Sequence, residues 1–522
     1  MAELIASIAA SRGDDPALID EFGVTTWSQL DERTNRLVNA LRGLGLSDGD
    51  TVALMSSNRR EFFEVFAASG HGSWIVVPVN WHWVADELAY VIENSGAAAV
   101  IVDERFVDVA AAARRDPRTA ACAHWIVIGD GGGDLADDYT SYEELVAAAS
   151  PAEPERQGMG GPMFYTSGTT GFPKGVRTSL IQIGVTPALM QLISGSFTEM
   201  LGLPVGGVTF LSGPAYHSAQ WVFSMFPLLA GGTIVMRHHF DAREMLELID
   251  DLGVTNVHLV PTQFIRLLKL PDEVRRSFDG SSLREVYHGA APCSSAVKRQ
   301  MLEWWGPIVH EYYGGTEGGF LSLIRGEDWL GKPGSLGRPL DSVEMRILDD
   351  GHQPVPVGTS GQIWFRSKLG SDFEYHDDPT KTAQAHLDGW GTLGDIGYFD
   401  ADGHLFMSDR KIDMVISGGV NIYPAEIEGV LVAHPAVADA AVFGIPDDEM
   451  GEQVKAVVEP TVGYAASDDL AAELIAHVRE HLAGYKAPRS VDFVEQLPRQ
   501  ETGKLYKRLL RDPYWEGTGR SI

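Results

Sequence analysis

The chain has 522 residues, of which 44% are hydrophobic and 22% are charged. It is too long for a single hydrophobic core, so we expect a soluble protein with two or more domains. Its 41 Lys and Arg residues against 72 Asp and Glu residues give a formal charge of −31, which argues against nucleic acid as a partner. The same charge repels anionic substrates such as nucleotides at long range, so local loops, a few cations and a metal ion would have to hold them.

The two cysteines, Cys122 and Cys293, are too few for a disulfide framework or a zinc-binding set, and they fit a reducing cytoplasm. The N-terminal stretch lacks a basic segment, so we expect no signal peptide. No apolar run reaches the roughly 18 residues that a membrane-spanning helix needs. We find no Cys/His metal cluster and no nucleophile elbow of the G-x-S-x-G type. These observations predict a cytoplasmic protein without a membrane span.

The first part of the chain alternates short apolar strands with helical patterns, which is typical of parallel sheets in an α/β fold. We expect strands at 52–55, 74–79, 97–102, 163–166, 208–211, 233–236, 254–260, 284–287 and 308–312. We expect helices at 60–69, 86–93, 220–229 and 241–252, and another that begins at Pro261. The stretch 130–154 is rich in Gly, Asp and Ala, and it predicts a loop.

From about residue 335 to 408 the pattern changes to short strands separated by Gly and Asp turns, and helical patterns vanish from about 343. The last unit has strands at 414–416, 440–443 and 454–458, a helix that begins at Pro424, and a helix over 467–483. The patterns predict an α/β protein. Its large N-terminal domain has mixed and parallel sheets with helices and a small β-subdomain, and a small α+β C-terminal domain follows.

The most informative stretch is 165–175, which reads Tyr-Thr-Ser-Gly-Thr-Thr-Gly-Phe-Pro-Lys-Gly and follows an apolar strand. Glycines let backbone N–H groups point inward and hydroxyls add donors, so such a loop suits phosphate oxygens. A flexible Ser/Gly linker is the alternative, but linkers seldom follow an apolar strand or end in Pro-Lys-Gly. The expected nucleotide contacts here are Thr166, Ser167, Gly168, Thr169, Thr170, Gly171 and Lys174.

A second glycine-rich turn reads Glu-Tyr-Tyr-Gly-Gly-Thr-Glu-Gly-Gly over 311–319. Tyr313 can supply an aromatic face for a base, Thr316 a phosphate contact, and Glu317 an oxygen ligand for Mg²⁺. The two stretches resemble the phosphate loop and the Tyr-Gly-x-Thr-Glu motif of the adenylate-forming superfamily. This superfamily includes acyl-CoA synthetases, non-ribosomal adenylation domains and beetle luciferases.

The resemblance covers nearly the whole chain, with the motifs in the expected order, and it implies roles for further residues. Asp395 would bind the ribose hydroxyls, although Leu393 stands where the family pattern usually has Thr. Lys504, which follows Thr-Gly near the C-terminus, would be the catalytic lysine, whose charge can stabilise the forming adenylate. The other residues that the resemblance places around ATP or AMP are Gly289, Ala290, Ala291, Glu311, Tyr312, Gly314 and Arg410.

The stretch 408–428 resembles the hinge and pantetheine-channel segment of acyl-CoA synthetases. The resemblance implies an N-terminal ATP- and acid-binding domain over 1–408, a hinge at 409–413 and a mobile C-terminal domain over 414–522. Ile412 departs from the Lys or Asp that many members have at this place in the hinge. The implied residues of the CoA channel are Ser417, Gly418, Gly419 and Lys486.

A Pro-x-x-His element ends at His217, which the resemblance places beside the acyl pocket. Relatives that activate amino acids carry Asp there, so His217 argues against a free α-amino acid as substrate. The implied pocket residues are Tyr216, Trp221, Phe264, Gly315 and Phe320, together with His217, Gly289 and Gly314. Glycines and aromatic residues suit a bulky, apolar or ring-bearing acid.

We therefore expect an ATP-dependent acyl-CoA ligase that uses Mg²⁺, forms an acyl-AMP and transfers the acyl group to coenzyme A. Its catalytic residues would be Lys504, Thr316, Glu317 and His217, and a homodimer is left open. Three alternatives share the same motifs. The acceptor could be the phosphopantetheine of a carrier protein, the protein could be a luciferase-like oxidoreductase, or only the thioesterification of a preformed acyl-AMP could be retained.

Overall fold

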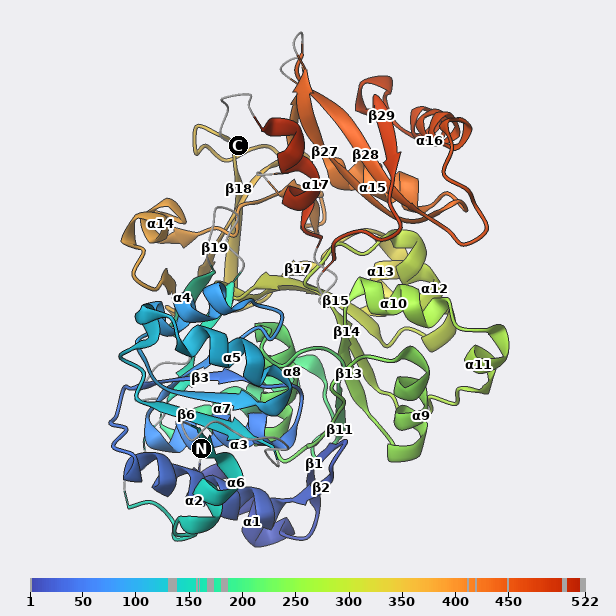
Figure 1. Cartoon of the computed structure of the whole chain (residues 1–522). Helices are drawn as coiled ribbons and strands as arrows, with labels where there is room; N and C mark the ends of the chain where they lie inside the picture. The colour runs from blue at the N-terminus through green and yellow to red at the C-terminus, as the bar shows by residue number, and fades with distance from the viewer. Residues whose placement is uncertain are drawn as a thin grey trace.

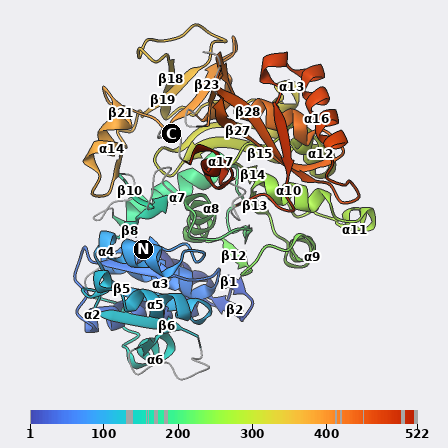
Figure 2. The same ribbon diagram turned by 45° about the horizontal axis from the view of Figure 1, so that its top comes forward.

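The computed structural model describes residues 2–129, 139–155, 158, 160–166, 173–179, 186–410, 413–417, 420–447, 450–499 and 505–516. Figure 1 shows two large sheets with helices in the lower half and the C-terminal elements at the top. Figure 2 shows the same arrangement from a second direction. Among the described residues, no helix combines the length and the apolar composition that are needed to cross a bilayer.

The first large sheet, sheet A, runs through the middle of the N-terminal part. Its order is β17 (Arg338–Pro339), β16 (Gly319–Ile324), β15 (Val309–Gly315), β14 (Glu285–His288), β13 (Asn256–Leu259), β11 (Val208–Leu211), β12 (Thr233–Met236), β1 (Pro16–Asp20) and β2 (Gly23–Thr26). The strands from β1 to β15 in this order pair in parallel, whereas β2, β16 and β17 pair antiparallel at the two edges. The carboxyl ends of the central strands therefore lie along one edge, where ligands bind in sheets of this kind.

The second large sheet, sheet B, is parallel throughout. Its order is β7 (Thr140–Ser141), β6 (His124–Ile128), β5 (Ala97–Asp103), β3 (Thr51–Met55), β4 (Ile75–Pro78) and β8 (Gly161–Pro162). Strand β3 is buried along its whole length, which explains why its sequence is a continuous apolar run rather than an alternating one.

A shared core fills the space between sheets A and B. The helices that contribute to it are α1 (Ala2–Arg12), α2 (Trp27–Gly43), α3 (Arg60–Gly72), α7 (Pro187–Leu201) and α8 (Ser218–Leu229). Trp27, Trp74 and Trp221 are almost completely buried there. Helices α3 and α8 are covered by protein on nearly all sides, as a helix between two sheets must be.

Separate helices cover the outer faces of both sheets. Outside sheet B lie α4 (Ala85–Ser95) and α5 (Val107–Arg114), and outside sheet A lie α9 (Ala242–Leu252), α10 (Pro261–Leu268) and α12 (Ser295–Trp305). Local signals define some ends well. The Asp241 side chain caps α9 by accepting hydrogen bonds from Arg243 N and Glu244 N, and Gly253 ends it in the left-handed conformation.

Two smaller sheets connect this part to the C-terminal elements. Sheet C has the order β20 (Phe373–Tyr375), β10 (Lys174–Thr178) and β9 (Phe164–Thr166). Sheet D has the order β21 (His386–Leu387), β22 (Trp390–Gly391), β19 (Gly361–Ser367), β23 (Asp395–Phe399) and β24 (Leu405–Arg410), and β18 (Val343–Leu348) pairs with β19. Strand β20 lies within the β-rich segment, so sheet C joins this segment to the phosphate-loop strands.

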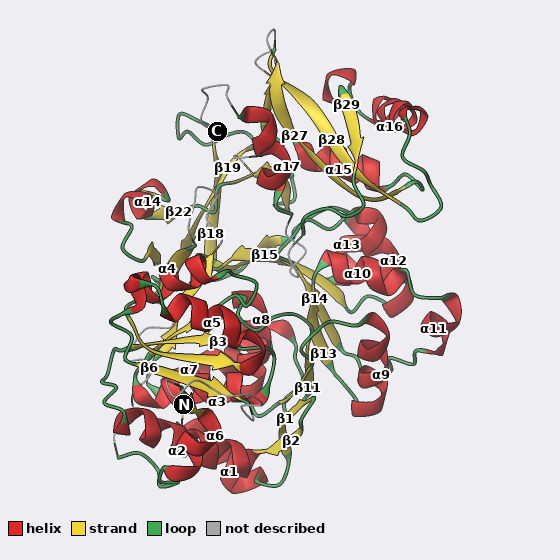
Figure 3. Ribbon diagram, viewed as in Figure 1, coloured by secondary structure: helices red, strands yellow, loops and turns green. Residues whose placement is uncertain are grey.

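The C-terminal elements have a sheet and a core of their own. Sheet E has the order β26 (Val420–Ile422), β25 (Val415–Ser417), β28 (Gly451–Pro460) and β27 (Val437–Asp447), with β29 (Ser490–Phe493) paired to β28. Three helices accompany it: α15 (Pro424–Val432), α16 (Asp468–His481) and α17 (Lys507–Trp515). Figure 3 shows this group of strands and helices at one end of the molecule.

The α/β fold class predicted from the sequence is confirmed, but two local predictions are wrong. Within the stretch predicted as loop, residues 142–148 form helix α6 (Tyr142–Ala148), which the Ser141 side chain caps. The β-rich segment also contains a short helix, α14 (Pro379–Gln384). Both helices have fewer than eight residues, which is too short for a clear helical repeat, and α6 is held by a tertiary contact of Tyr142.

That contact belongs to a buried ionic cluster between α2, α3 and α6. Glu64 has no exposed surface, and it accepts hydrogen bonds from Arg33 Nε at 2.6 Å and from Tyr142 Oη at 2.8 Å. Arg33 also pairs with Glu143 at 2.6 Å. The cluster fixes α6 against the helices of the shared core.

We expect Arg33→Met to lower the free energy of unfolding by about 3–5 kcal/mol, because it leaves the Glu64 carboxylate buried without its cation. Urea denaturation would measure the change. Arg276→Met is the matched control, since both side chains of the Arg276–Asp272 pair are mostly exposed, and it should change stability by less than about 0.5 kcal/mol. Equal effects of the two substitutions on the free energy of unfolding would contradict the stabilising role of the buried Arg33–Glu64 pair.

Candidate active site

The candidate site lies where the carboxyl ends of the sheet A strands meet sheets C and D. Strand β9 ends at Thr166, and Lys174 pairs with it across the hairpin at the start of β10. Ser167, Gly168, Thr169, Thr170 and Gly171 lie outside the described residues. Burial lowers the pKa of the Lys174 ammonium, which is partly covered at the base of this loop.

The Thr316–Glu317 turn is tied to two other segments of the site. The hydroxyl groups of Thr316 and Ser218, the first residue of α8, lie 2.7 Å apart. Tyr375 Oη donates to Glu317 Oε1 at 3.1 Å. Because Tyr375 pairs with Val176 on β10, this hydrogen bond places the Glu317 carboxylate beside the strand that follows the phosphate loop.

The residues expected to contact the adenine base and the ribose also lie next to each other. Tyr313 Oη donates to Asp395 Oδ2 at 2.7 Å, and both side chains are buried. Asp395 on β23 is the cross-strand partner of Arg410 on β24. The glycine at position 314 is required by the hairpin, because a side-chain carbon there would lie 2.0 Å from Gly319 O.

The segment after β14 approaches β15 very closely. A side-chain carbon on Gly289 would lie 2.6 Å from the Tyr312 ring. Ala290 has φ of +64°, a left-handed conformation that is uncommon for a residue with a side chain. Backbone strain of this kind persists where the surrounding structure enforces it, and it clusters at functional sites. Ala291 follows at the same strand end.

Glu311, expected to border the adenine, forms a buried ion pair with Lys298 of α12. Its Oε2 lies 2.7 Å from Lys298 Nζ, and the Lys298 side chain has no exposed surface. Burial raises the pKa of Glu311 and lowers the pKa of Lys298, and the attraction between the two charges opposes both shifts. The sequence analysis missed Lys298, since a lysine on an amphipathic helix gives no sign of a buried partner.

The structure also shows how the His217 segment is held. Asn58, in the loop after β3, donates through Nδ2 to Gly213 O at 3.0 Å and to Arg237 O at 3.1 Å. Its Oδ1 accepts from Ala215 N at 2.9 Å. The buried Asn58 side chain, which follows a strand of sheet B, thereby fixes the segment after β11 of sheet A. This segment leads to His217, the N-cap residue of α8. No local sequence signal identifies Asn58, because its partners are more than 150 residues away.

A buried polar chain runs beneath the same segment. Gln220 Nε2 lies 3.0 Å from His258 Nδ1, and His258 Nε2 lies 3.0 Å from Tyr312 Oη. Burial lowers the pKa of His258 to about 3, so the ring is neutral at physiological pH. The chain connects α8, β13 and β15, and so fixes the His217 helix relative to the Tyr312–Tyr313 strand.

The residues expected to line an acyl pocket lie in different surroundings. Phe320 packs on Tyr312, with ring centroids 4.4 Å apart, between sheet A and α8. Trp221 packs against Phe66 and borders a small, mainly apolar cavity formed by α3, α7, α8 and β8. Tyr216 lies next to His217 and contacts Trp81.

Phe264 lies apart from these residues. It has no exposed surface and packs on His288 in the core on the other face of sheet A. The structure therefore separates Phe264 from Trp221 and Phe320, which belong to the core on the opposite face of sheet A. Gly315, by contrast, is partly exposed and faces Leu393.

The residues expected to serve the second half-reaction belong to the C-terminal elements. Ser417 ends β25, and Lys486 pairs with Glu426 of α15 at 2.5 Å. Gly418, Gly419, Ile412 and Lys504 lie outside the described residues. The two flanks of the Lys504 loop are joined, because Arg499 and Leu505 form an isolated antiparallel bridge.

Comparison with known proteins decides the family. The model of AMP-binding enzymes matches residues 5–370, and the model of the AMP-binding enzyme C-terminal domain matches residues 426–504. The chain belongs to the AMP-binding enzyme family. The predicted resemblance to adenylate-forming enzymes is thus confirmed, and the chain is an AMP-forming acid–thiol ligase.

Similar curated members of the family act on different acids. The chain is 30% identical to the fatty acid–[acyl-carrier-protein] ligase ScoC of Streptomyces coeruleorubidus, over 97% of this chain and 95% of ScoC. It is 33% identical to feruloyl-CoA synthase of an Amycolatopsis species, over 93% of both chains. Among solved structures, the anthranilate CoA ligase AuaEII in complex with anthranoyl-AMP has a TM-score of 0.86 and 26% identity, over 99% of this chain and 98% of AuaEII.

Asn58→Ala removes two hydrogen bonds to the segment that leads to His217 and a third to Arg237 O after β12. We expect it to lower stability by about 2–3 kcal/mol. We also expect it to lower kcat/KM for the acid by about tenfold to a hundredfold, because a displaced segment misplaces the reacting groups. Steady-state kinetics and urea denaturation would measure both changes.

The matched control is Asn39→Ala, since Asn39 Nδ2 also donates to two backbone carbonyls, Ser150 O and Ala152 O, at 2.9 Å each. This control should leave kcat/KM unchanged. The positioning role of Asn58 would be ruled out if Asn58→Ala reduced stability but kept the activity of the unsubstituted enzyme.

Proposed function

We propose that the ligase activates a bulky, apolar or ring-bearing carboxylic acid as its acyl-AMP and transfers the acyl group to the thiol of coenzyme A. The observation that carries this proposal is the convergence of three hydrogen bonds at one edge of sheet A: Thr316–Ser218, Glu317–Tyr375 and Tyr313–Asp395. They connect the segments that carry the expected phosphate, metal, base and ribose contacts. A family member with this arrangement has the groups that an adenylation needs.

In the first half-reaction, a carboxylate oxygen of the acid attacks the α-phosphorus of ATP. A bond from this oxygen to phosphorus forms, the bond to the pyrophosphate oxygen breaks, and negative charge grows on the phosphoryl oxygens. Donors of the 166–174 loop, the Thr316 hydroxyl and the Lys504 ammonium would stabilise this charge. The Glu317 carboxylate is a hard oxygen ligand of the type that Mg²⁺ prefers, and the ion would supply charge neutralisation on the phosphates.

In the second half-reaction, the thiol attacks the carbonyl carbon of the mixed anhydride and AMP leaves. We propose that residues 409–413 act as the hinge between a domain over 1–408 and a C-terminal domain over 414–522. Rotation about it would replace Lys504 by the 417–419 segment and Lys486 at the same site. In support, sheet D ends at Arg410 and sheet E begins at Val415, each with its own core.

The class of acid is inferred from two independent features. Aromatic side chains of α7, α8, β15 and β16 pack against one another, with the Phe223 and Phe320 ring centroids 5.4 Å apart. Relatives over nearly the whole chain include feruloyl-CoA synthase and 3-oxocholest-4-en-26-oate–CoA ligase of Rhodococcus rhodochrous, whose named acids contain rings. An apolar pocket with few polar groups suits such acids.

The direct test measures acid-dependent release of pyrophosphate from ATP with and without coenzyme A, over a panel of fatty, aryl and polycyclic acids. Mass spectrometry would follow the thioester. Pyrophosphate plus acyl-CoA from a ring-bearing acid supports the proposal. Thioester formed only on a carrier protein would show that the acceptor is a carrier-protein phosphopantetheine, as the name of ScoC implies for that enzyme, and not coenzyme A. Thioester formed only from supplied acyl-AMP would show that the first half-reaction has been lost.

Lys504→Ala should lower the rate of adenylation by about a hundredfold or more, because it removes a positioned charge from the transition state. Conversion of supplied acyl-AMP to thioester should remain largely intact. Rapid-quench assays of each half-reaction would measure both rates. The control is Arg508→Ala, an exposed cation four residues further on, which should leave both rates unchanged. An equal loss of both half-reactions in Lys504→Ala would contradict the proposal that Lys504 serves adenylation only.

Gly419→Leu should have the opposite effect, because the added side chain would fill the path of the thiol. We expect thioesterification of supplied acyl-AMP to fall and adenylation to continue. Gly429→Leu in α15 is the control, since a side-chain carbon at position 429 meets no atom within 4 Å. An unchanged thioesterification rate in Gly419→Leu would remove this segment from the proposed path.

A further inference from the structure

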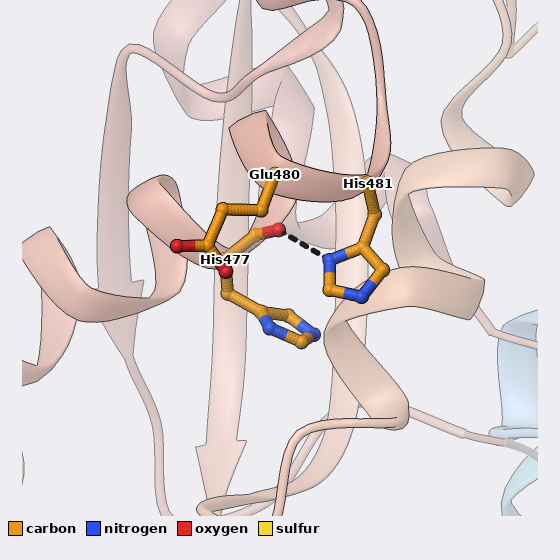
Figure 4. A group of neighbouring side chains, drawn as sticks. All are labelled: His477, Glu480 and His481. Atoms are coloured by element: carbon orange, nitrogen blue, oxygen red, sulfur yellow. Dashed lines mark hydrogen bonds between the residues drawn. The ribbon is translucent and has the colours of Figure 1, made fainter.

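Three potential ligand side chains converge at the C-terminal end of α16, outside the site described above. His477, Glu480 and His481 each offer one ligand atom, and these atoms lie within 4.8 Å of one another. Figure 4 shows the two imidazole rings and the carboxylate around one space at the end of the helix. The spacing of three and four residues places all three side chains on one helix face.

The sequence showed no Cys/His metal cluster, and His477, Glu480 and His481 are a group that only the structure brings to notice. The signal that could have found the group is the spacing of three and four residues on a helix. It was missed because two histidines on an exposed helix are a common pattern, and their imidazoles meet only when the helix forms.

Each of the two imidazoles uses one ring nitrogen in a hydrogen bond to the backbone, so the other ring nitrogen remains for a ligand. His481 Nδ1 lies 2.8 Å from the backbone oxygen of His477, and a carbonyl oxygen can only accept, so Nδ1 carries the hydrogen. Nε2 of His481 is therefore the ring nitrogen that remains for a metal ion. Nε2 of His477 is covered but has no hydrogen-bond partner among the described residues, while the same ring hydrogen-bonds with the backbone of Val430. Metal-bound histidines typically use their other ring nitrogen in this way.

The electrostatic surroundings also suit a cation. His477, Glu480 and His481 lie in the last turns of α16, where the helix dipole is negative. Glu473 lies one turn earlier and pairs with His434 at 3.3 Å.

We propose that His477, Glu480 and His481 form a site for Zn²⁺ or a similar divalent transition metal at the end of α16. Ligand atoms about 2.0–2.2 Å from a tetrahedral ion lie about 3.3 Å from one another. Rotation of the exposed Glu480 and His481 side chains that brings the ligand atoms closer by up to about 1.5 Å would close the present spacing of at most 4.8 Å. Water would complete the coordination. The imidazoles select against Mg²⁺, which separates this site from the Mg²⁺ ligand proposed at Glu317.

A bound ion would join neighbouring positions of the last helical turn and so oppose fraying of α16, where helix carbonyl groups lack intrahelical partners. The 3₁₀ turn Gly484–Lys486 follows directly. The site would therefore stabilise the segment that carries Lys486.

A second cluster provides the internal comparison. Asp400, Asp402 and His404 also lie close together, but the ammonium of Lys332 already pairs with both carboxylates, at 2.7 Å from Asp400. A lysine in the centre of such a group replaces a metal ion. This cluster should not bind Zn²⁺.

The test uses the full chain without a histidine tag, freed of metal with a chelator that is then removed by dialysis. Isothermal titration calorimetry with Zn²⁺ and with Mg²⁺, and the absorption spectrum with Co²⁺, would measure binding. We expect Zn²⁺ to bind at one site and to raise Tm, and Mg²⁺ to do neither. His477→Ala and His481→Ala should each weaken Zn²⁺ binding at least about tenfold and remove the Co²⁺ absorption.

His404→Ala is the matched control and should bind Zn²⁺ like the unsubstituted chain. Circular dichroism would verify that each variant is folded. The proposal is overturned if folded His477→Ala and His481→Ala retain the Zn²⁺ affinity of the unsubstituted chain, or if that chain binds Zn²⁺ no more tightly than Mg²⁺.

Discussion

The structure depends on one apolar core buried between two sheets. Trp27, Trp74 and Trp221 come from different segments and are almost completely covered between sheets A and B. Burial of side chains of this size contributes about 25 cal/mol for each Å² removed from water, so separation of the sheets would be very unfavourable. Helices α3 and α8 lie between the two sheets and are apolar on both faces, so both sheets hold them in position.

This arrangement brings together loops that are far apart in the chain. Asn58 follows a strand of sheet B, whereas Gly213 and Ala215 follow a strand of sheet A. Their hydrogen bonds form only because the core fixes the two sheets relative to each other. The same reasoning applies to Tyr375 and Glu317, which sheet C and the β15–β16 hairpin bring within hydrogen-bonding distance. Short polar contacts thus fix the site, and the apolar core fixes the elements that make those contacts.

The site must bind anions in a strongly acidic protein. The chain carries a formal charge of −31, yet its expected nucleotide contacts are backbone donors, hydroxyl groups and the Lys174 cation. Local donors act at short range, where the overall charge matters little, and salt screens the long-range repulsion beyond about 10 Å. The acidity that disfavours nucleotides at a distance favours metal cations, and the end of α16 combines it with two imidazoles and a carboxylate.

The sequence by itself determined the α/β class, many of the central strands, several helices and the order of the motifs. The helix predicted over 241–252, for example, is α9, which the Asp241 side chain caps, because capping depends on neighbours within three residues. The same locality made the glycine-rich loops and the family recognisable. The sequence could not predict helix α6, since its stability depends on the contact of Tyr142 with Glu64, 78 residues away.

Only the tertiary structure decided which side chains meet. It paired Glu311 with Lys298, connected Gln220, His258 and Tyr312, and placed Phe264 on the opposite face of sheet A from Phe320. The face to which a strand or helix residue points depends on register and packing, which a local pattern does not specify. Local chemistry is therefore determined by the sequence, and the partners of buried polar groups are determined by the packing of the sheets.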